Sequence, residues 1–421
     1  MANNLSSNVS KIVARKFLEH FESSRVVSKT VDTQLIAGLH GPSTGDTVYL
    51  KRPHQFKAIN TADGDLTGLG NDIISGQAPA TTQDLASVKV EWNSVEEALE
   101  LDQLDEILRP AAEELVIDVE KRLVDYIITN SNLSYGEPAT AVSRWSDIAG
   151  AGALMDAVGV PMSGDRYYVM NPFTTVALAD TQSGLASGSN NLVDTAWQRA
   201  QLSGNFGGLK AITSNALRSY TTGDSADRVG ALSANPDVTY VTHKDSMRQT
   251  LAVSGFTPST TIKAGEVLEI SGRNRVNSRN GEVILKGTFA EVFRAVVSQD
   301  VTLDGTGAGS IVISGPAIYE ANGSYNTVDS APVSGDVITL KSADNTVVQP
   351  NLFYHKQAFA LAAVELKKLH ATDTIMNTMD GMSVRMTKYS NGDAGTNKVR
   401  FDLLPAFGRL NPFFAGQGFG A

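Results

Sequence analysis

Cysteine is absent from this chain of 421 residues, and several other features are scarce. Without cysteine the chain has neither disulfide bonds nor thiolate metal ligands. Charged residues make up only 19% of it, and no stretch approaches the ~18 continuous apolar residues of a membrane-spanning helix. The first residues lack the apolar core and cleavage site of a signal peptide. We therefore expect a protein that is made in the cytosol and does not enter a membrane.

Patterns that would mark a catalytic or metal-binding site are missing as well. No two histidines lie three or four residues apart, so a histidine-based metal site is not expected. His370 and Asp373 could orient an imidazole, although a solvated helix end explains this pair better. The glycine-rich run 305–309 lacks the preceding strand and following helix of a phosphate-binding loop, so it predicts a turn. We expect no enzymatic activity and no cofactor.

What the composition does provide is the material for a folded protein. Apolar residues make up 42% of the chain, which is enough for a substantial core in one to three domains. The 37 glycines suggest many turns and therefore many strands. The net charge of −10 argues against a protein whose main task is to grip phosphates, because affinity for duplex DNA rests on clustered lysine and arginine. The charge is compatible with an acidic wall that merely surrounds nucleic acid.

One stretch, residues 94–130, predicts a long helix around which the rest of the chain is arranged. Ser94 and Glu97 form a capping box at its start. Pro110 either kinks one helix or begins a second. Apolar residues recur along one face at helical spacing: Leu101, Leu104, Ile107, Leu108, Ala112, Val116, Val119, Leu123, Tyr126 and Ile127.

The first 30 residues predict a basic amphipathic helix. Apolar side chains lie on one of its faces: Val9, Ile12, Val13, Phe17 and Phe21. The basic residues Lys11, Arg15 and Lys16 lie elsewhere around it. A terminal helix this apolar must dock on its own domain, on a neighbouring subunit or on a partner.

Residues 38–93 have a different character. Two β-like runs, Thr47–Lys51 and Ala86–Trp92, enclose a middle that is rich in Gly, Asp, Thr and Asn and has almost no core-forming residues. A segment of this length without a core is uncommon in a compact domain, unless it is functional or reaches another molecule. We predict an extended two-stranded loop.

The following segment, up to about residue 220, has the pattern of an α/β core. Helices alternate with apolar strands, and Gly159, Asn171 and Pro172 supply helix ends and starts. The predicted elements are a helix over Trp145–Val158, a strand over Arg166–Met170, a helix from Pro172 to Ala179, a helix over Leu192–Gln201 and a strand at the end of Asn205–Thr213.

From Tyr220 to about Pro350 the pattern becomes that of a small all-β barrel or sandwich, with short alternating runs separated by turns. The predicted strands are Val238–Thr242, Gln249–Val253, Glu266–Ile270, Glu282–Lys286, Ala295–Leu303, Ile311–Ile313 and Asp336–Lys341. Beyond it, Met382–Tyr389 and Lys398–Leu404 predict a hairpin. We therefore expect an α+β protein in which one α/β unit is split by an inserted β-domain.

Several long stretches, in this order, resemble the P22-like group of tailed-bacteriophage major capsid proteins and within it the Sf6-type coats, which have the HK97-like fold. The stretches that carry the resemblance are NVSKIVARKFL (8–18), TGDTVYLKRPHQF (44–56), LDQLDEILRP (101–110), WSDIA (145–149), NFGGLKAITSN (205–215), PNLFYHK (350–356) and KVRFDLLPAF (398–407). The resemblance covers essentially the whole chain.

The resemblance implies a division of the chain into named parts. Residues 1–37 would be the N-arm and 38–93 the E-loop, which overlaps a neighbouring subunit. The spine helix of the P-domain would lie in 94–139, with further P-domain strands and the C-terminus in 381–421. The A-domain would come from 140–220 and 350–380. Residues 221–349 would be the inserted all-β barrel, the I-domain.

The same resemblance implies a coat protein that assembles into an icosahedral shell around double-stranded DNA. Its partners would be other coat subunits in hexamers and pentamers, a scaffolding protein and a portal protein, with assembly in the host bacterial cytoplasm, expansion on maturation and a final place in the virion. Crosslinking of E-loop lysines is not expected in this group. The candidate inter-subunit or scaffold contacts are Lys11, Arg15, Lys16, Glu19, Glu22, Lys51, Arg52, Lys57, Lys244, Asp245, Arg273, Arg275 and Arg279.

Some alternatives stay open at this level. The loop that reaches between capsomers would be His243–Met247 or Arg273–Glu282, and the arginines of the second loop could touch phosphate or simply lie in a surface loop. A non-viral encapsulating shell of the same fold would predict a cargo peptide. A glycan-acting enzyme with a β-sandwich module would predict a small oligomer and an essential acidic pair.

Overall fold

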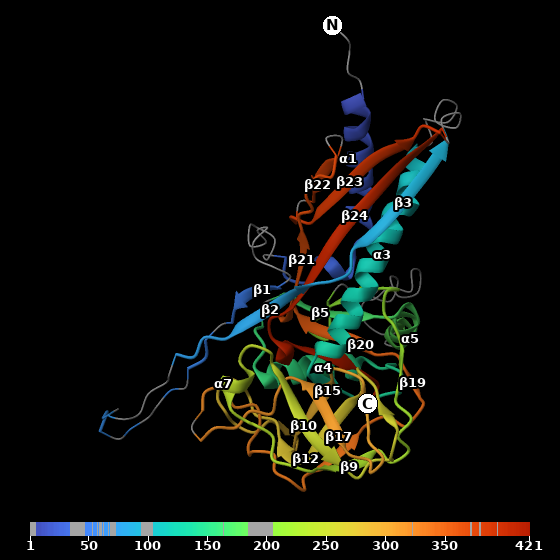
Figure 1. Ribbon diagram of the computed structural model, residues 1–421. Coiled ribbons are helices and arrows are strands. Elements are labelled where there is room, and N and C mark those ends of the chain that lie inside the picture. The colour runs from blue at the N-terminus through green and yellow to red at the C-terminus, as the bar shows by residue number, and fades with distance from the viewer. Residues whose placement is uncertain are drawn as a thin grey trace. The chain divides into compact units, whose positions relative to one another are not determined.

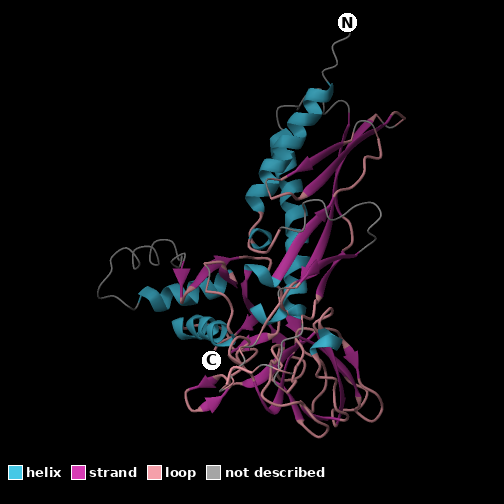
Figure 2. Cartoon of the chain, turned by 90° about the vertical axis from the view of Figure 1, so that its left-hand side faces the viewer, coloured by secondary structure: helices cyan, strands magenta, loops and turns pink. Residues whose placement is uncertain are grey.

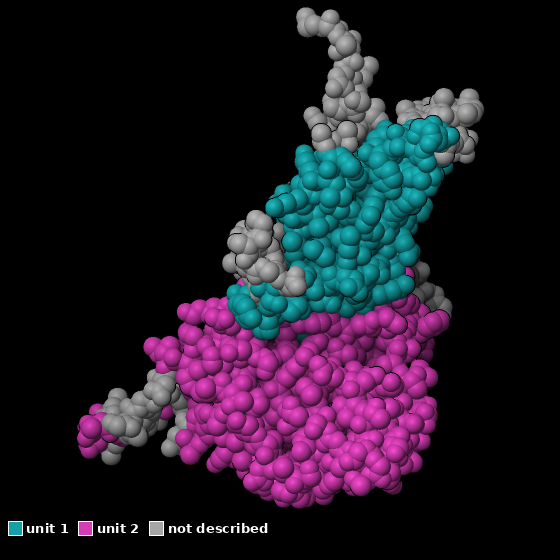
Figure 3. All heavy atoms as spheres, in the orientation of Figure 1, with its two compact units in different colours: residues 1–49, 79–124, 359–408 teal, residues 50–78, 125–358, 409–421 magenta. Residues whose placement is uncertain are grey.

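The computed structural model of the chain divides into two compact units (Figures 1 and 3). Unit 1 comprises residues 1–49, 79–124 and 359–408, and unit 2 comprises residues 50–78, 125–358 and 409–421. The structure describes residues 6–33, 47–52, 54–56, 58, 61, 63–65, 67, 73–93, 104–162, 164–183, 205–321, 323–370, 373–378, 380–393 and 395–421.

Unit 1 is organised around a seven-stranded sheet in which β24 is the central strand. The strands follow the order β1-β2-β24-β23-β22, and β3 and β21 also pair with β24. Their bounds are β1 (Thr47–Lys51), β2 (Gln77–Thr82), β3 (Ala86–Asn93), β21 (Phe359–Val364), β22 (Thr374–Asn377), β23 (Ser383–Asn391) and β24 (Thr396–Arg409). The antiparallel pairing of β23 with β24 confirms the predicted hairpin.

The strands predicted at the two ends of 38–93 exist, but they pair with other strands and not with each other. β3 pairs with β24, from Thr396 opposite Asn93 to Leu403 opposite Ala86. β1 instead lies beside β2, a strand that the sequence pattern did not reveal, because its QAPATT segment contains proline and few residues of high β propensity. The loop is therefore bounded by β1 and β2.

The long helix α3 (Leu104–Asn130) is continuous through Pro110. The predicted apolar face of this helix is buried, with Val116, Val119 and Leu123 each at most 2% exposed. Of the two alternatives for Pro110, the start of a second helix is therefore wrong. The predicted capping box of Ser94 and Glu97 lies outside the described residues.

The N-terminal helix α1 (Ser6–Ser24) packs within unit 1, followed by the short 3-10 helix η1 (Val27–Lys29). Phe17 and Phe21 are at most 1% exposed. The ring of Phe17 stacks on Phe401 of β24, with 3.7 Å between the ring centroids. Of the three alternatives for docking this helix, the structure shows the first, in which the helix packs on its own chain.

Unit 2 contains a six-stranded mixed sheet with helices packed on it. The strand order is β4-β25-β20-β5-β7-β6. Their bounds are β4 (Leu133–Tyr135), β5 (Arg166–Met170), β6 (Asn205–Phe206), β7 (Leu209–Thr213), β20 (Asn351–His355) and β25 (Ala415–Gly418), and the helices are α4 (Trp145–Val158), α5 (Pro172–Ser183), η4 (Lys356–Ala358) and η5 (Pro412–Phe414).

Two of these elements, α4 and β5, have the predicted bounds, because local signals define their ends. Asp147 Oδ2 accepts hydrogen bonds from the backbone N–H groups of Ser143 and Arg144 at the start of α4. Gly159, with φ at +93°, ends this helix in the left-handed conformation. Asn171 Oδ1 accepts from the N–H of Phe173 at the start of α5. The helix predicted at 192–201 lies outside the described residues.

The rest of unit 2 is dominated by a closed antiparallel barrel in the order β10-β17-β15-β12-β18-β9. In Figure 2 this region is almost entirely strand and loop. The barrel strands are β9 (Val229–Leu232), β10 (Arg248–Ser254), β12 (Val267–Asn274), β15 (Val292–Val297), β17 (Gly309–Ser314) and β18 (Val337–Leu340). The interior is filled by apolar side chains from these strands, including Leu251, Leu268, Phe293, Ile311 and Ile338, all fully buried.

Three two-stranded sheets and a short helix lie between the barrel strands in sequence or next to them. The sheets are β8 (Tyr220–Thr221) with β19 (Val347–Val348), β11 (Thr261–Ile262) with β16 (Val301–Thr302) and β13 (Leu285–Lys286) with β14 (Phe289–Ala290), and the helix is α7 (Tyr240–His243). The strand predicted at Val238–Thr242 is wrong. Asp237 Oδ1 accepts from the N–H and hydroxyl of Thr239 and so favours a turn into α7. The single strand predicted at Ala295–Leu303 is also wrong, because residues 298–300 belong to no strand and separate β15 from β16.

Candidate assembly surfaces

The exposed side of α1 carries the charged residues that were singled out in the N-terminal arm. Arg15, Lys16 and Glu19 are exposed and Glu22 is half-buried, whereas the side chain of Lys11 lies outside the described residues. The helix thus uses its apolar face inside unit 1 and leaves a charged face at the surface.

A buried carboxylate that the sequence pattern did not reveal binds the segment that follows α1, at Val26 and Ser28. Glu120 of α3 is 4% exposed. Its Oε1 accepts hydrogen bonds from the N–H of Val26 (2.5 Å), the N–H of Ser28 (3.3 Å) and the hydroxyl of Ser28 (3.1 Å). Arg25 donates to Asp380 at 3.0 Å, and burial lowers the pKa of this arginine although Asp380 opposes the shift. Only the tertiary fold brings residue 120 to residues 26–28.

The loop between β1 and β2 has no core of its own. Among its described residues from Leu50 to Ala78, only Arg52, Gly76 and Ala78 are buried. Phe56 is 59% exposed and Ile73 is 73% exposed. Large apolar side chains that a loop without a core exposes to water are stabilised when a neighbouring molecule covers them.

The base of this loop is tied to the barrel by hydrogen bonds within unit 2. Lys244 Nζ donates to the carbonyl of Ser75 at 3.2 Å. Asp245 Oδ1 accepts from the N–H of Gln77 at 2.9 Å. The two singled-out residues Lys244 and Asp245 therefore hold the loop where it leaves the sheet. Lys51 is exposed, and Lys57 lies outside the described residues.

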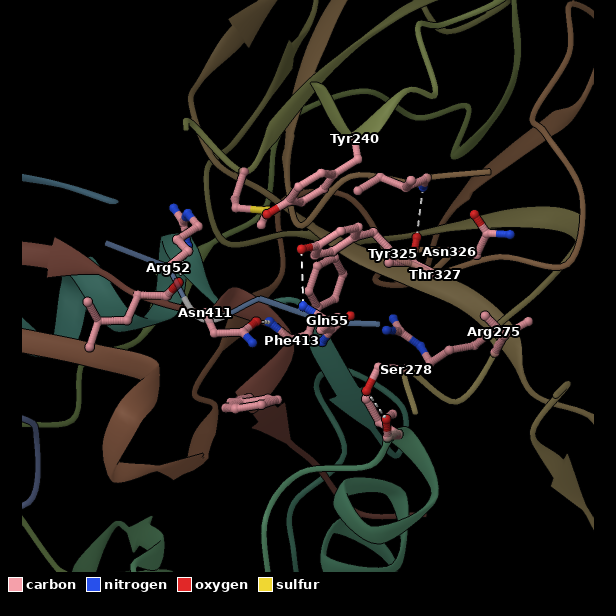
Figure 4. A pocket seen from close by; sticks show the side chains of 16 residues that line it. Arg52, Gln55, Tyr240, Arg275, Ser278, Tyr325, Asn326, Thr327, Asn411 and Phe413 are labelled. Atoms are coloured by element: carbon pink, nitrogen blue, oxygen red, sulfur yellow. Dashed lines mark hydrogen bonds between the residues drawn. The ribbon is translucent and has the colours of Figure 1, made fainter. Parts of the chain in front are cut away.

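Two of the singled-out arginines have intramolecular roles. Arg273 makes a two-point ion pair with Asp336, with Nε–Oδ2 and Nη2–Oδ1 distances of 2.8 Å. Arg52 is 4% exposed and donates to the backbone carbonyl groups of Leu410 and Asp245. The Arg52 side chain is buried within unit 2 (Figure 4), whereas the Arg273 side chain keeps 18% of its surface exposed.

The turn around Arg279 packs on the end of α4 rather than projecting freely. Asn277 Nδ2 donates to the carbonyl of Ala157 at 2.7 Å, and the Ser278 hydroxyl donates to that of Val158 at 2.9 Å. The exposed Arg279 donates from Nε to the carbonyl of Gly159 at 3.0 Å. This turn therefore satisfies carbonyl groups that the end of a helix leaves unpaired.

The described residues hold no group of three or more histidine, aspartate or glutamate side chains that could bind a metal ion. Asp373 does not face the imidazole of His370; its Oδ2 accepts from the backbone N–H groups of Leu369 and His370. The glycine-rich run 305–309 forms a turn that is organised by Asp304, whose Oδ1 accepts from the N–H groups of Thr306 and Ala308. No helix of the described part is both long and apolar enough to cross a bilayer.

Comparison with known proteins matches the whole chain. Residues 1–420 match the family described as P22 coat protein, gene protein 5. The major capsid protein of Acyrthosiphon pisum secondary endosymbiont phage 1 is 41% identical over 424 residues, which covers 100% of each chain.

Solved structures of low similarity to this chain include one of Mycobacterium phage Che8, with a TM-score of 0.44 and 11% identity over 93% of this chain and 90% of that chain. The capsid of cyanophage P-SCSP1u has a TM-score of 0.43 and 12% identity over 90% of this chain and 84% of that chain. At these scores the assignment rests on the sequence matches alone.

These matches place the chain among the structural proteins of virus shells and not among enzymes. It belongs to the P22 coat protein family, whose match spans residues 1–420, and it is a bacteriophage major capsid protein. The enzyme alternative is therefore set aside.

Proposed function

We propose that the chain assembles, as hexamers and pentamers, into the icosahedral shell that encloses packaged double-stranded DNA. The observation that carries this proposal is the loop between β1 and β2, which has no core and exposes Phe56 and Ile73. A lone subunit gains nothing from such a loop. Full burial of each of these side chains against a neighbour would stabilise the contact between the two subunits by about 1.5–3 kcal/mol. Repeated heterologous contacts of this kind close into shells when the geometry permits.

The division into capsid domains is part of the same proposal. Residues 1–37 would serve as the N-arm, 38–93 as the E-loop, and 94–139 with 381–421 as the P-domain. The A-domain would be formed by 140–220 and 350–380, and the I-domain by 221–349. The closed barrel supports the last assignment, because its strands run from Val229 to Leu340 and lie within that segment.

Assembly would proceed through a procapsid built with a scaffolding protein, with a portal protein at one vertex and expansion on maturation in the host bacterial cytoplasm. The exposed charges Arg15, Lys16 and Glu19 on α1, together with Lys51 and Arg279, are the contacts that we propose for neighbouring subunits or scaffold. The net charge of −10 fits a wall along which DNA slides without being gripped. A steep salt dependence of DNA binding by purified subunits would contradict this last point.

The shell proposal is tested by expressing the chain with and without the neighbouring scaffolding gene, followed by sedimentation and negative-stain microscopy. Regular closed shells with scaffold, and aberrant shells or monomers without it, are expected. A homogeneous small oligomer under both conditions would refute the proposal.

A double variant, Phe56→Asp with Ile73→Asp, tests the role of the loop itself. It should abolish shell formation while the subunit keeps its far-UV circular dichroism, because both side chains are exposed in the subunit. Val333→Asp is the matched control, since this valine is also exposed (42%) but lies in a barrel turn. Shells of normal yield from the double variant would exclude the loop as an assembly contact.

A further inference from the structure

Strand β3 lies at an edge of the sheet in unit 1 (Figure 1). It pairs with β24 along its whole length, and its backbone makes no hydrogen bonds to another strand of the described chain. Edge strands are often protected by a proline or a β-bulge. Here the segment ASVKVEWN (86–93) contains no proline, and its register with β24 has no shift. Alternate N–H and C=O groups on its outer side can therefore bind a further strand.

The apolar face of the sheet is only partly covered at this edge. Val88 and Val90 point to the same face, because they are two residues apart on one strand. They lie opposite Phe401 and Val399 of β24, which are at most 2% exposed. Both valines are only half-buried. A strand added beside β3 would cover them, and the burial of apolar surface would stabilise the contact.

The other face of β3 carries one exposed charge of each sign. Lys89 and Glu91 keep 45% and 39% of their side-chain surfaces exposed, and they form an ion pair with 2.9 Å between Nζ and Oε2. Glu91 also pairs with Lys398 of β24, at 2.9 Å. The two charges of β3 lie one on each side of Val90. This arrangement allows the strand to be complementary in charge to a copy of itself.

Charge and side-chain direction together favour one register for two antiparallel copies of β3. When the pair is centred on Val90, Lys89 of each copy lies opposite Glu91 of the other, which is a favourable cross-strand pair. Centring the pair on Lys89 or on Glu91 would place like charges directly opposite, which is destabilising. A shift by one residue would place the charged face of one copy beside the valine face of the other. The register centred on Val90 is therefore favoured.

We propose that β3 is a docking edge for a second copy of this chain, and that the two β3 strands pair antiparallel about a twofold axis at Val90. This inference rests on the proposed shell function, because an icosahedral shell contains twofold axes about which identical surfaces meet. An edge of eight residues buries less than the ~1,000 Å² of a stable interface. We therefore expect the pairing in assembled shells and in concentrated subunits, but not in dilute subunits.

The test uses single cysteines, since the chain has none of its own and an introduced thiol can crosslink only to its copy in another coat subunit. Val90→Cys is oxidised with diamide, both in shells formed with the scaffolding gene and in concentrated purified subunits. Non-reducing gels then measure the disulfide-linked dimer. The Cα atoms of directly opposite residues lie about 4.5–5.5 Å apart, a separation that a disulfide spans. We expect a dimer of Val90→Cys in both samples.

Val88→Cys is the matched control, because Val88 is half-buried on the same face of the same strand. In the proposed register the two copies of residue 88 are four residues apart, roughly 13 Å along the strands. This separation is too large for a disulfide, so Val88→Cys should give roughly tenfold less dimer than Val90→Cys. Circular dichroism checks that each variant is folded.

A mixing experiment tests the charge pairing without changing contacts inside either subunit. With Val90→Cys in both chains, Lys89→Glu gives an edge with two negative charges and Glu91→Lys gives an edge with two positive charges. Each variant alone places like charges opposite one another and should crosslink poorly. An equal mixture of the two should give at least about fivefold more dimer than either alone, because opposite charges then face each other.

Three results would overturn the edge pairing: no dimer of Val90→Cys in either sample, equal dimer yields from Val88→Cys and Val90→Cys, or no gain on mixing. Regular shells of Val90→Cys that do not crosslink would refute the edge pairing and leave the shell proposal standing. If no shells form, the shell proposal fails, and the concentrated subunits decide the edge pairing by themselves.

Discussion

Replacing the buried Asp402 should destabilise unit 1 even when the new side chain has nearly the same size. The carboxylate is fully buried on β24. Its Oδ2 accepts from Arg385 Nη2 at 2.7 Å, and its Oδ1 accepts from Arg400 Nε at 2.5 Å and from the Ser87 hydroxyl at 2.6 Å. These donors lie on β23, β24 and β3. One side chain therefore connects three adjacent strands of the sheet.

Asp402→Asn preserves the size of the side chain and removes its charge. The guanidinium of Arg385, with a side chain only 9% exposed, then loses its counter-charge. The asparagine side chain has one acceptor oxygen where the carboxylate has two, and the other described acceptor of Arg385 is the carbonyl of Lys367 at 2.9 Å. The Nε of Arg385 is buried without a described partner. Breaking a buried ion pair from one side costs about 3–5 kcal/mol. We expect the free energy of unfolding to fall by about 3 kcal/mol or more.

Urea unfolding of purified full-length subunits, followed by circular dichroism and tryptophan fluorescence, measures this loss. Glu91→Gln is the matched control, because Glu91 lies on β3 of the same sheet and pairs with Lys89 and Lys398, both at 2.9 Å. Its ion pairs are exposed to water, so little change is expected. Exposed ion pairs contribute at most about 1 kcal/mol. If Asp402→Asn lowers the free energy of unfolding by less than this, the ion pair of Asp402 with Arg385 does not stabilise the sheet as a buried pair should.

Three further predictions concern the arm, a barrel turn and the response to acid. Phe17→Ala removes a buried ring that stacks on Phe401, which should cost about 3 kcal/mol and accelerate hydrogen exchange in α1 but not in the barrel; unchanged exchange in α1 would contradict the packing. Gly307→Ala should lower the melting temperature more than Gly335→Ala, because both have positive φ but only at residue 307 would the new methyl group lie 2.0 Å from a carbonyl oxygen, that of Phe256; equal melting temperatures would count against this geometry. Hydrogen bonds from Arg273 hold the pKa of Asp336 below its usual range, so its ionised form stabilises the fold above pH ~4 and this contribution is lost as the pH falls further. Acid unfolding monitored by circular dichroism should therefore show a shallower decline below pH ~4 in Arg273→Gln, and identical profiles would refute the linkage.

Much of the local structure could be predicted from the sequence because short-range signals define it. The bounds of α4 and β5 follow from the caps and turn residues at their ends. The apolar face of α3 follows from its period, and the structure buries it. The strand expected at Val238–Thr242 does not form, and the reason is also local. Asp237 Oδ1 accepts from the N–H of Thr239, and this hydrogen bond favours a turn over a strand.

The candidate site residues were harder to predict, because their surroundings come from distant parts of the chain. Arg52 meets carbonyl groups that lie 193 and 358 residues further along. Its charge and its place in a polar loop suggested a surface contact, yet it is buried. In the sequence, Glu120 is one of several charged residues on a predicted helix. In the structure, it accepts three hydrogen bonds from Val26 and Ser28.

By itself, the sequence determined several of the helices and strands, such as α4 and β5, the apolar faces of α1 and α3, and the family to which the chain belongs. Only the tertiary structure decided that β3 pairs with β24 rather than with β1, and that Arg52 is buried against carbonyl groups of distant residues. The physical reason is that a period of 3.6 or 2 residues records which side of an element is apolar. It does not record the partner against which that side is buried, because pairing depends on the burial and register of segments that lie hundreds of residues apart.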